Sequence, residues 1–512
     1  MKNHIKCLFL VPALMAGLGL ILTNKVTAQT FTTLHTFRAV AGIYSTNSDG
    51  DYLLGGLILS GNTLYGTAGY GGTNGLGTVF ALNTDGSSFI TLHTFTAAAG
   101  IHTTNSDGAR PEAGLILSGN NLYGTAAYGG TNGTGTVFAL STNGSNFITL
   151  HTFGALVGFS TSDGYDPQAG LVLSGNTLYG TAFAGDTNGG GTVFSVSTNG
   201  SNYITLHTFT ALAGFYNTNS DGSQPYAGLV LSGNTLYGTA EYGGTNGRGT
   251  VFAVSTNGSN SITLHTFSAV ATNYLDIFTN SDGYGPQAGL ILSGNTLYGT
   301  AAKGGTNGSG TVFSVSTNGS SFITLHNFST EATSQLGIDT NSDGAGPNAG
   351  LILSGSTLYG TASAGGTNGS GTVFSVSTNG SNFITLHNFS TEATNQLGIN
   401  TNSDGAGPNA GLILSGSTLY GTTSAGGTNG SGTVFSLTVM LPVVPQLAIA
   451  LSGANVILTW PTNAAGFTLE SATNLVPPAI WITNASLPVV VGTNNAVTNG
   501  ISGTRKFYRL SR

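Results

Sequence analysis

Histidines and aspartates recur along the chain at spacings that could support chemistry. A histidine follows Thr-Leu at His35, His93, His151, His207, His265, His326 and His387, and a Ser-Asp-Gly step carries Asp49, Asp107, Asp163, Asp221, Asp282, Asp343 and Asp404. Histidine is the commonest metal ligand, so such a series could indicate metal binding. Each histidine, however, occupies the same position of a separate repeat. We therefore expect the histidines to lie far apart and interpret them as structural.

One aspartate-containing segment also resembles a calcium loop. Asp339, Asn341 and Asp343 stand at alternate positions and Gly344 follows them, as in the opening of loops whose side-chain oxygens converge on Ca²⁺. The acidic residue expected at the twelfth position of such a loop is Gly350 instead. The alternative is a turn shaped by Asx hydrogen bonds. Calcium is the one cofactor that the sequence suggests, with these three residues as candidate ligands.

Tyrosines in the connecting segments are the candidate ligand-binding residues. They are Tyr70, Tyr128 and Tyr242 in one class of loop, and Tyr165 and Tyr216 in another. Aromatic rings among Asn, Ser and Asp suit a polysaccharide, because the apolar face of a sugar stacks on a ring while its hydroxyls take the polar groups. The alternative is that these rings only pack loops against one another.

Acids that break the repeat pattern are the candidates for catalysis. They are Glu112, Asp166, Asp186 and Glu241. A glycosidase needs two carboxyl groups a few ångströms apart in different environments, and no spacing among these four singles out a pair. We therefore predict a protein without enzymatic activity that binds a polysaccharide or cell-surface component. The alternatives are a polysaccharide hydrolase or lyase and a purely structural surface protein.

The elements that must position these residues repeat along the chain. A Leu-Tyr-Gly-Thr step recurs at Tyr65, Tyr123, Tyr179, Tyr237, Tyr298, Tyr359 and Tyr420, with spacings of 56 to 61 residues. Self-similarity at such a period indicates a repeat architecture. Distances inside each repeat are constant, and the length varies only between the Phe of Leu-His-Thr/Asn-Phe and the next Gly-Leu. That segment is therefore a loop, because loops absorb insertions.

Each repeat predicts four β-strands. The first complete unit gives GLILS, TLYGTA, GTVFAL and FITLHTF, which are rich in β-branched and aromatic residues and are separated by turn-forming segments. Four antiparallel strands per repeat are typical of a propeller blade. The last repeat lacks its fourth strand, whereas an unpartnered TFTTLHTF stands at residues 30–37. We therefore predict an all-β, seven-bladed β-propeller closed by the N-terminal strand, since closure leaves no exposed sheet edge.

These repeated residues resemble a known family. The LYGT, GG and GTVF steps and the DG-x-x-P-x-AGL segment are similar to the GloVer tandem repeat of exported bacterial proteins, over about residues 30 to 437. The resemblance implies the repeat type and export but no specific activity. Many relatives end in a Pro-Glu-Pro sorting tail with a membrane helix, whereas this chain ends in KFYRLSR. We therefore expect no anchor of that kind.

The first residues predict a cleaved signal peptide, residues 1–28. Lys2 and Lys6 flank an apolar run, and Val26-Thr27-Ala28 supplies the small residues that a signal peptidase reads. Removing this leader leaves 8 basic against 18 acidic residues, a net charge of −10. Such a surface repels nucleic acid and anionic lipid. We expect a secreted or cell-surface monomer that has no transmembrane anchor after cleavage.

The texture of the sequence changes after the repeats. We predict the propeller over 29–437, a linker over 438–446 and a small β-sandwich over 447–512, because short apolar runs and both tryptophans, Trp460 and Trp481, follow the Pro-containing linker. The sandwich resembles the fibronectin III or immunoglobulin-like appendages of exported bacterial proteins. It could serve as a spacer or cap, or as a sorting or attachment module.

Overall fold

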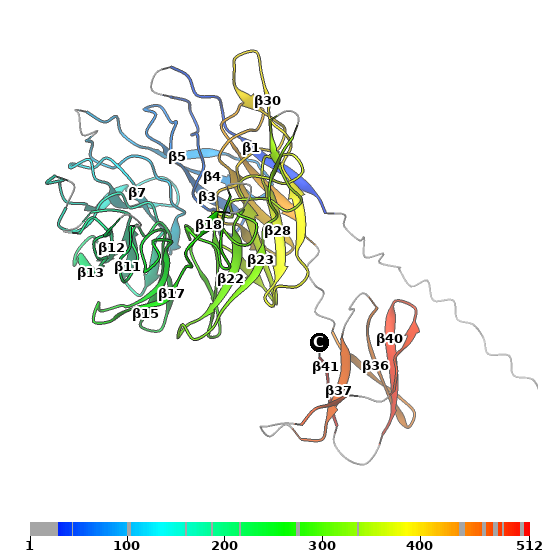
Figure 1. Ribbon diagram of the computed structural model, residues 1–512. Coiled ribbons are helices and arrows are strands. Elements are labelled where there is room, and N and C mark those ends of the chain that lie inside the picture. The colour runs from blue at the N-terminus through cyan, green and yellow to red at the C-terminus, as the bar shows by residue number, and fades with distance from the viewer. Residues whose placement is uncertain are drawn as a thin grey trace, which may run out of the picture. The chain divides into compact units, whose positions relative to one another are not determined.

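The computed structural model describes residues 29–42, 45–99, 104–158, 161–185, 188–214, 217–272, 277–334, 337–439, 446–462, 467–474, 480–483, 486–501 and 506–511. The predicted signal peptide and most of the predicted linker lie outside these residues. The chain divides into two compact units, Met1–Val439 and Met440–Arg512 (Figure 1). Every helix or strand assigned in the described residues is a β-strand, which confirms the predicted all-β class. None of these residues forms a helix long and apolar enough to cross a bilayer.

The first unit contains seven four-stranded antiparallel sheets, numbered here 1 to 7 in chain order. Their first strands are β2 (Ile58–Ser60), β6 (Ile116–Ser118), β10 (Val172–Ser174), β14 (Val230–Ser232), β20 (Ile291–Ser293), β26 (Ile352–Ser354) and β32 (Ile413–Ser415). Their second strands are β3 (Thr63–Ala68), β7 (Asn121–Ala126), β11 (Thr177–Ala182), β15 (Thr235–Ala240), β21 (Thr296–Ala301), β27 (Thr357–Ala362) and β33 (Thr418–Thr423). In sheets 1 to 6 the strands lie side by side in the order in which they follow along the chain.

The third and fourth strands of each sheet form the predicted hairpin. The third strands are β4 (Thr78–Asn83), β8 (Thr136–Ser141), β12 (Thr192–Ser197), β16 (Thr250–Ser255), β22 (Thr311–Ser316), β28 (Thr372–Ser377) and β34 (Thr433–Thr438). The fourth strands of sheets 1 to 6 are β5 (Ile90–Thr94), β9 (Ile148–Thr152), β13 (Ile204–Thr208), β17 (Ser261–Thr266), β23 (Phe322–Asn327) and β29 (Ile384–Asn388). In sheet 7 this place is taken by β1 (Phe31–Thr36), which pairs antiparallel with β34.

The hydrophobic cores lie between neighbouring sheets. One cluster joins Val79 and Phe95 at sheet 1 to Leu122 and Phe138 of sheet 2, and similar clusters join the sheets that follow. Another cluster joins Phe37, Tyr420 and Val434 at sheet 7 to residues of sheet 1 such as Leu64 and Phe80. Each repeat therefore buries its apolar residues only against its neighbours, as expected of a repeat architecture.

The seven histidines belong to these contacts between sheets. The Nε2–H of each donates to the carboxylate of the Asp in the next Ser-Asp-Gly step, at 2.9 to 3.3 Å. Six of them also stack on an aromatic ring of the following sheet, with ring centroids 3.7 to 4.0 Å apart. The Asp in turn accepts backbone N–H groups beyond the fourth strand, as Asp404 does from Ser390. Each His–Asp pair thus fastens a long loop to its sheet.

Three of the long loops contain a small two-stranded ribbon. The ribbons are β18 (Ala271–Thr272) with β19 (Phe278–Thr279), β24 (Ala332–Thr333) with β25 (Asp339–Thr340), and β30 (Ala393–Thr394) with β31 (Asn400–Thr401). They occur in the longest loops, those of sheets 5 to 7, so the added residues extend the loop and leave the sheet unchanged.

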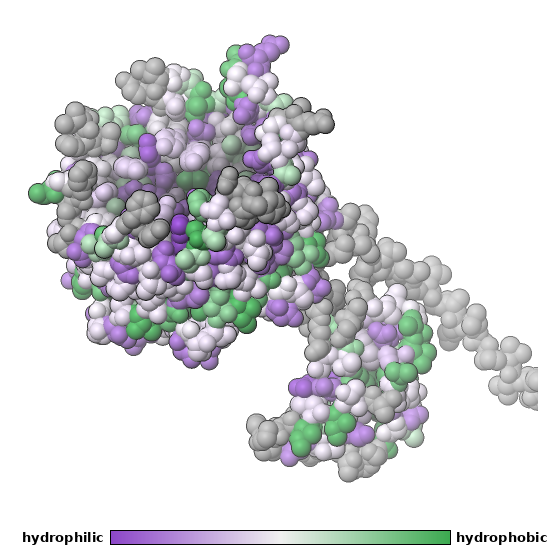
Figure 2. All heavy atoms as spheres, viewed as in Figure 1, coloured by the Kyte–Doolittle hydropathy of each residue, from purple (hydrophilic) through white to green (hydrophobic). Residues whose placement is uncertain are grey.

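The second unit consists of two small sheets that share one core. One sheet has the order β35 (Ala448–Ser452), β36 (Asn455–Pro461), β40 (Asn494–Gly500), β39 (Val489–Val491), and the other β38 (Ile482–Thr483), β37 (Thr468–Ala472), β41 (Phe507–Ser511). Leu458, Trp460, Leu469 and Val497 form the core. Figure 2 shows apolar residues on the visible surface of this unit, where Leu451 and Val489 are among the exposed side chains.

Candidate functional site

A cavity of about 310 Å³ lies where the first strands of all seven sheets begin. Equivalent glycines line it from every sheet, Gly56, Gly114, Gly170, Gly228, Gly289, Gly350 and Gly411, and these same glycines also line a second cavity bordered by leucines. Each packs against the backbone of its predecessor, and a Cβ on Gly114 would lie 3.0 Å from the Gly56 oxygen. Glycine is thus needed here for close approach of the backbones. We call the first of these the axial cavity.

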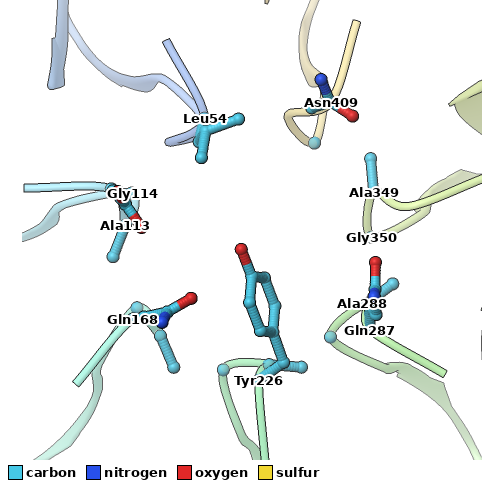
Figure 3. Close-up of a pocket in the computed structure, with 18 of the residues that line it drawn as sticks. Leu54, Ala113, Gly114, Gln168, Tyr226, Gln287, Ala288, Ala349, Gly350 and Asn409 are labelled. Carbon is cyan, nitrogen blue, oxygen red and sulfur yellow. The ribbon is translucent and has the colours of Figure 1, made fainter. Parts of the chain in front are cut away.

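One variable position per repeat supplies the chemistry of the axial cavity. It is the residue just before Ala-Gly-Leu in sheets 2 to 7, and before Gly-Gly-Leu in sheet 1; its occupants in sheets 1 to 7 are Leu54, Glu112, Gln168, Tyr226, Gln287, Asn348 and Asn409. Figure 3 labels five of them, Leu54, Gln168, Tyr226, Gln287 and Asn409, which come from separate repeats and surround one open space, with the Tyr226 hydroxyl pointing into it. Tyr52 also lines the cavity. Aromatic, amide and carboxylate groups therefore share a space at the lower end of the range typical of small-molecule sites.

Two carboxyl groups at the axial cavity, those of Glu112 and Asp166, have strongly raised pKa values. Burial and the negative charge of Asp166 raise the pKa of Glu112 to about 7, although Arg110 lowers it. Burial likewise raises the pKa of Asp166 to about 6, against hydrogen bonds from Gln168 and Tyr128. Perturbed carboxyl groups beside a cavity are typical of functional sites.

A second variable position shows unusual backbone geometry. Four residues have φ between 55° and 61°, namely Tyr52, Arg110, Asp166 and Gln224, whereas the equivalent residues of sheets 5 to 7 are Gly285, Gly346 and Gly407 with φ between 62° and 65°. Glycine adopts this conformation without strain, whereas other side chains raise the free energy by about 1 kcal/mol or more. Side chains are therefore retained at this position in sheets 1 to 4 in spite of the strained conformation.

The structure brings two of the predicted tyrosines together around Arg110. Its guanidinium lies 4.6 Å from the ring centroid of Tyr70 and 4.8 Å from that of Tyr128. The Tyr128 hydroxyl donates to Asp166 Oδ2 at 3.3 Å. Burial and the charge of Asp166 raise the pKa of Tyr128 to about 12. These rings position Arg110 and Asp166 beside the axial cavity and do not themselves line it.

The other predicted tyrosines are dispersed. Tyr242 is 39% exposed, and its pKa is raised to about 12 by burial and by the neighbouring Glu241. Tyr165 pairs through its backbone with Ala184 and is not a lining residue. Tyr216 lies outside the described residues. The ligand-binding role of all five therefore stays a prediction.

Three of the four predicted acids come close to the axial cavity. Glu112 lines it, while Asp166 and Glu241 accept hydrogen bonds at 2.8 Å from the lining residues Gln168 and Gln287. Asp186 lies outside the described residues. The acids thus contact the cavity directly or through an amide side chain.

The candidate calcium ligands have protein partners. Asp343 accepts from Ser329 N and pairs with His326, and Asn341 Oδ1 accepts the N–H groups of Gly344 and Gly366. Asp339 accepts from the Thr333 hydroxyl, within the β24–β25 ribbon. No group of three or more acidic, His or Cys side chains suited to a metal occurs in the described part of the chain. These contacts favour the turn alternative, and calcium binding stays a prediction.

The sequence analysis did not single out most of the lining residues. Of these residues only Glu112 is among the candidates predicted from the sequence, whereas Tyr226, Gln168, Gln287, Asn348 and Asn409 are not. The signal was present, because a single variable residue interrupts the otherwise constant Pro-x-Ala-Gly-Leu segment of sheets 2 to 7. Since this segment leads into the first strand of each sheet, its variable side chain was placed to meet its equivalents at the centre.

Comparison with known proteins gives a family but no activity. A search of curated proteins returned no match. Similar solved structures include an oligogalacturonate lyase in complex with manganese (10% identity, TM-score 0.44, 80% of this chain and 96% of that one) and a puromycin-hydrolysing peptidase of Mycobacterium tuberculosis (13%, 0.44, 81% and 61%). A putative 6-phosphogluconolactonase from Bacteroides uniformis is also similar (15%, 0.41, 70% and 88%). At these scores the likenesses support no inference about activity.

The family match rests on the repeats themselves. The profile of the Gloeobacter/Verrucomicrobia repeat matches four overlapping segments, residues 14–214, 101–274, 215–398 and 268–440. Together they span most of the chain, including every sheet of the first unit. The predicted tandem-repeat resemblance is thereby confirmed, and the chain belongs to the Gloeobacter/Verrucomicrobia repeat family.

Proposed function

We propose that the first unit is a closed seven-bladed β-propeller whose axial cavity binds a saccharide. The pairing of β1 with β34 and the core shared by sheets 7 and 1 support closure. The mutual packing of the seven glycines supports it as well, since Gly56 packs on Gly411 as Gly114 packs on Gly56. A ring of this kind converts one variable residue per repeat into a single site with contributions from every blade.

The observation that carries the binding proposal is the lining of the axial cavity. Tyr226 offers an aromatic face and a hydroxyl, and the amides of Gln168, Gln287 and Asn348 surround the same space. A sugar has apolar ring faces and peripheral hydroxyls, so it can satisfy both kinds of group at once. The side chains held at positive φ in sheets 1 to 4 add Arg110 and Asp166 beside this cavity.

The remaining parts of the chain fit an exported protein. We propose that residues 1–28 are removed on export and that the mature chain is a secreted or cell-surface monomer. The second unit, two small sheets around Trp460, is proposed as a fibronectin III or immunoglobulin-like appendage.

Glycan binding by the purified mature chain tests the proposal. We expect the parent to bind at least one soluble oligosaccharide, and Tyr226→Ala to weaken that binding about tenfold by removing the stacking face. Tyr284→Ala is the matched control, because Tyr284 lies in the same kind of loop, under Arg248, and does not line the axial cavity. Equal binding by parent and Tyr226→Ala, or no binding by the parent, would contradict the proposal.

A polysaccharide hydrolase or lyase is the second candidate. It is favoured by the raised pKa of Glu112, about 7, because an acid that holds its proton near neutral pH can donate it to a leaving group. Release of new reducing ends from a polysaccharide that the parent binds would support catalysis if Glu112→Gln abolished the release. If the parent and the variant both bind the polysaccharide but release no reducing ends, the protein binds without catalysing hydrolysis or elimination.

A further inference from the structure

Two glutamine side chains in the axial cavity are oriented by carboxylates behind them. Gln168 Nε2 donates to Asp166 Oδ2 and Gln287 Nε2 donates to Glu241 Oε1, both at 2.8 Å. An ionised carboxylate only accepts hydrogen bonds, so each amide must direct its NH₂ group backwards. The carbonyl oxygen is then left for the cavity, and Figure 3 shows the Gln168 oxygen on the side of the open space.

The two asparagines are oriented in the same way. Asn409 Nδ2 donates to the Gly407 carbonyl at 3.2 Å, and Asn409 Oδ1 accepts from Asn348 Nδ2 at 3.2 Å. A carbonyl oxygen cannot donate, so this chain of bonds fixes both amides. Asn348 therefore also presents its oxygen. Among the described residues, no protein donor reaches the amide oxygens of Gln168, Gln287 and Asn348. These oxygens are also not among the buried atoms that lack a partner, so they are open to the cavity.

Two carboxyl groups, one in the lining and one beside it, also favour a hydrogen-bond donor as the ligand group. Glu112 is the lining residue with a formal charge, and it is an acid. Asp166 is 6% exposed, and its Oδ1 is buried without a hydrogen-bond partner while Oδ2 holds Gln168. A buried acceptor without a donor is unfavourable. The oriented amide oxygens and the carboxyl group of Glu112 therefore give the cavity several acceptors. The donors of the lining are the tyrosine hydroxyls and the second hydrogen of each amide NH₂ group.

We infer that the axial cavity selects a ligand bearing an ammonium group, and that the saccharide is an amino sugar with a free amine. An ammonium has three donors, no acceptor and a positive charge, so it complements Glu112 and the amide oxygen of Gln168 from the next sheet. The same lining disfavours a uronic acid, whose carboxylate would face Glu112. This inference rests on the proposed saccharide-binding function.

The electrostatic surroundings of Glu112 give the preference a pH dependence. Its neighbours are Arg110 and Asp166, and its charge also raises the pKa values of Tyr70, Tyr128 and Tyr226, the last of which responds to Glu241 as well. The pKa of Glu112 is about 7. Near pH 6 this carboxyl group is therefore largely protonated and attracts an ammonium weakly. The attraction strengthens as the pH rises through about 7, over the range in which the ligand amine is still protonated.

The test compares a short β-linked glucosamine oligomer with its N-acetylated counterpart of the same length, by calorimetric titration of the full mature chain. Acetylation keeps the sugar frame but removes the charge and two of the three donors. We expect the free-amine oligomer to bind about tenfold more tightly near pH 7, and this advantage to shrink near pH 6. Glu112→Gln should remove most of the advantage of the free-amine oligomer over the N-acetylated one. Glu392→Gln, which removes an acid remote from the cavity lining, should retain it.

The outcomes separate the two proposals. Equal or tighter binding of the N-acetylated oligomer would overturn the amine preference and leave saccharide binding in place. A free-amine preference that Glu112→Gln does not reduce would overturn the assignment to this cavity. If a broad panel of neutral and charged oligosaccharides fails to bind, the saccharide-binding function itself is wrong.

Discussion

The contacts between sheets predict one stabilising substitution, Ser261→Phe. Six histidines of the repeats stack on an aromatic ring from the next sheet, but the position facing His207 holds Ser261. The strand itself is equivalent to the others, because Ser261 pairs with Val254 as Phe322 pairs with Val315 in the next sheet. A phenylalanine at 261 should therefore take up the place that Phe322 occupies.

The geometry around Phe322 sets the expected magnitude. Its ring stacks on His265 at 3.8 Å, stacks on Phe313 at 5.1 Å and meets Phe267 edge-on at 5.8 Å. Each aromatic pair contributes about 0.5 to 1.5 kcal/mol, and partial burial adds about 1 kcal/mol. Ordering the side chain costs about 0.5 to 1 kcal/mol, and the pair energies are not additive. We therefore expect Ser261→Phe to raise the free energy of unfolding by about 1 to 2 kcal/mol.

Urea unfolding followed by far-ultraviolet circular dichroism measures this change. Tryptophan fluorescence would not report on it, because both tryptophans lie in the second unit. Thermal unfolding is a weaker assay, since a cooperative unit of roughly 400 residues shifts by only about 1 °C per kcal/mol. The matched variant is Phe322→Ser, which should lose about what Ser261→Phe gains. Repeating Ser261→Phe in a His207→Ala background isolates the stack, for which we expect a coupling of about 0.5 to 1.5 kcal/mol.

Two results would refute this reasoning. If Ser261→Phe destabilises the chain while Phe322→Ser also destabilises it, sheets 4 and 5 are not equivalent at this position. If Ser261→Phe stabilises equally with and without His207, the histidine is not the partner and the gain comes from burial alone.

Three further predictions follow from the same contacts. Deleting residues 30–37 should abolish cooperative unfolding or cause aggregation, because it removes β1 from sheet 7; a deletion variant that melts like the parent would contradict closure. If Asp339, Asn341 and Asp343 bind calcium, millimolar calcium should raise the melting temperature, because a ligand that binds only the native state stabilises it; no rise, or a rise that survives Asp339→Ala, would leave these residues as turn formers. Burial alone would raise the pKa of Asp404, but hydrogen bonds from His387 and Ser390 hold it below 3.8. Its stabilising contribution is therefore present above about pH 4 and lost as the pH falls further, and Asp404→Asn should flatten the acid limb of a stability profile.

The sequence predicted the strands because the distances within each repeat are constant. Residue alternation and Asn-Gly turns located the hairpin that ends at Phe95, for example, without tertiary information. The structure differs in detail. The first strand runs only over Ile58–Ser60, shorter than the predicted GLILS, because Gly56 and Leu57 border the central cavities instead of continuing the ladder.

The site was harder to predict because strand alternation gives the face on which a loop lies but not its distance from the centre. Tyr70 and Tyr128 lie in the loops between the second and third strands of sheets 1 and 2. They enclose Arg110 and do not line the axial cavity. Tyr226 does line it. Whether a tyrosine lines the cavity depends on its position in the connection that leads to the first strand of a sheet. That position cannot be read from one repeat alone, because the cavity forms only where several repeats pack together.

The strongest argument for function is the contrast between constant and variable positions. Every repeat needs a left-handed residue three positions after the Asp of Ser-Asp-Gly, and glycine at 285, 346 and 407 meets that need without strain. Arg110, Asp166 and Gln224 occupy the same conformation at a cost of about 1 kcal/mol each. Selection for stability alone would favour glycine at all seven. The strained residues also cluster in sheets 1 to 4, the half of the ring that holds Glu112 and Tyr226. Other side chains at positive φ, such as Ser88 and Asn146, lie in the hairpin turns, where the turn geometry itself requires that conformation. At the position beside the cavity glycine would serve, so the side chains kept there support the proposed ligand site.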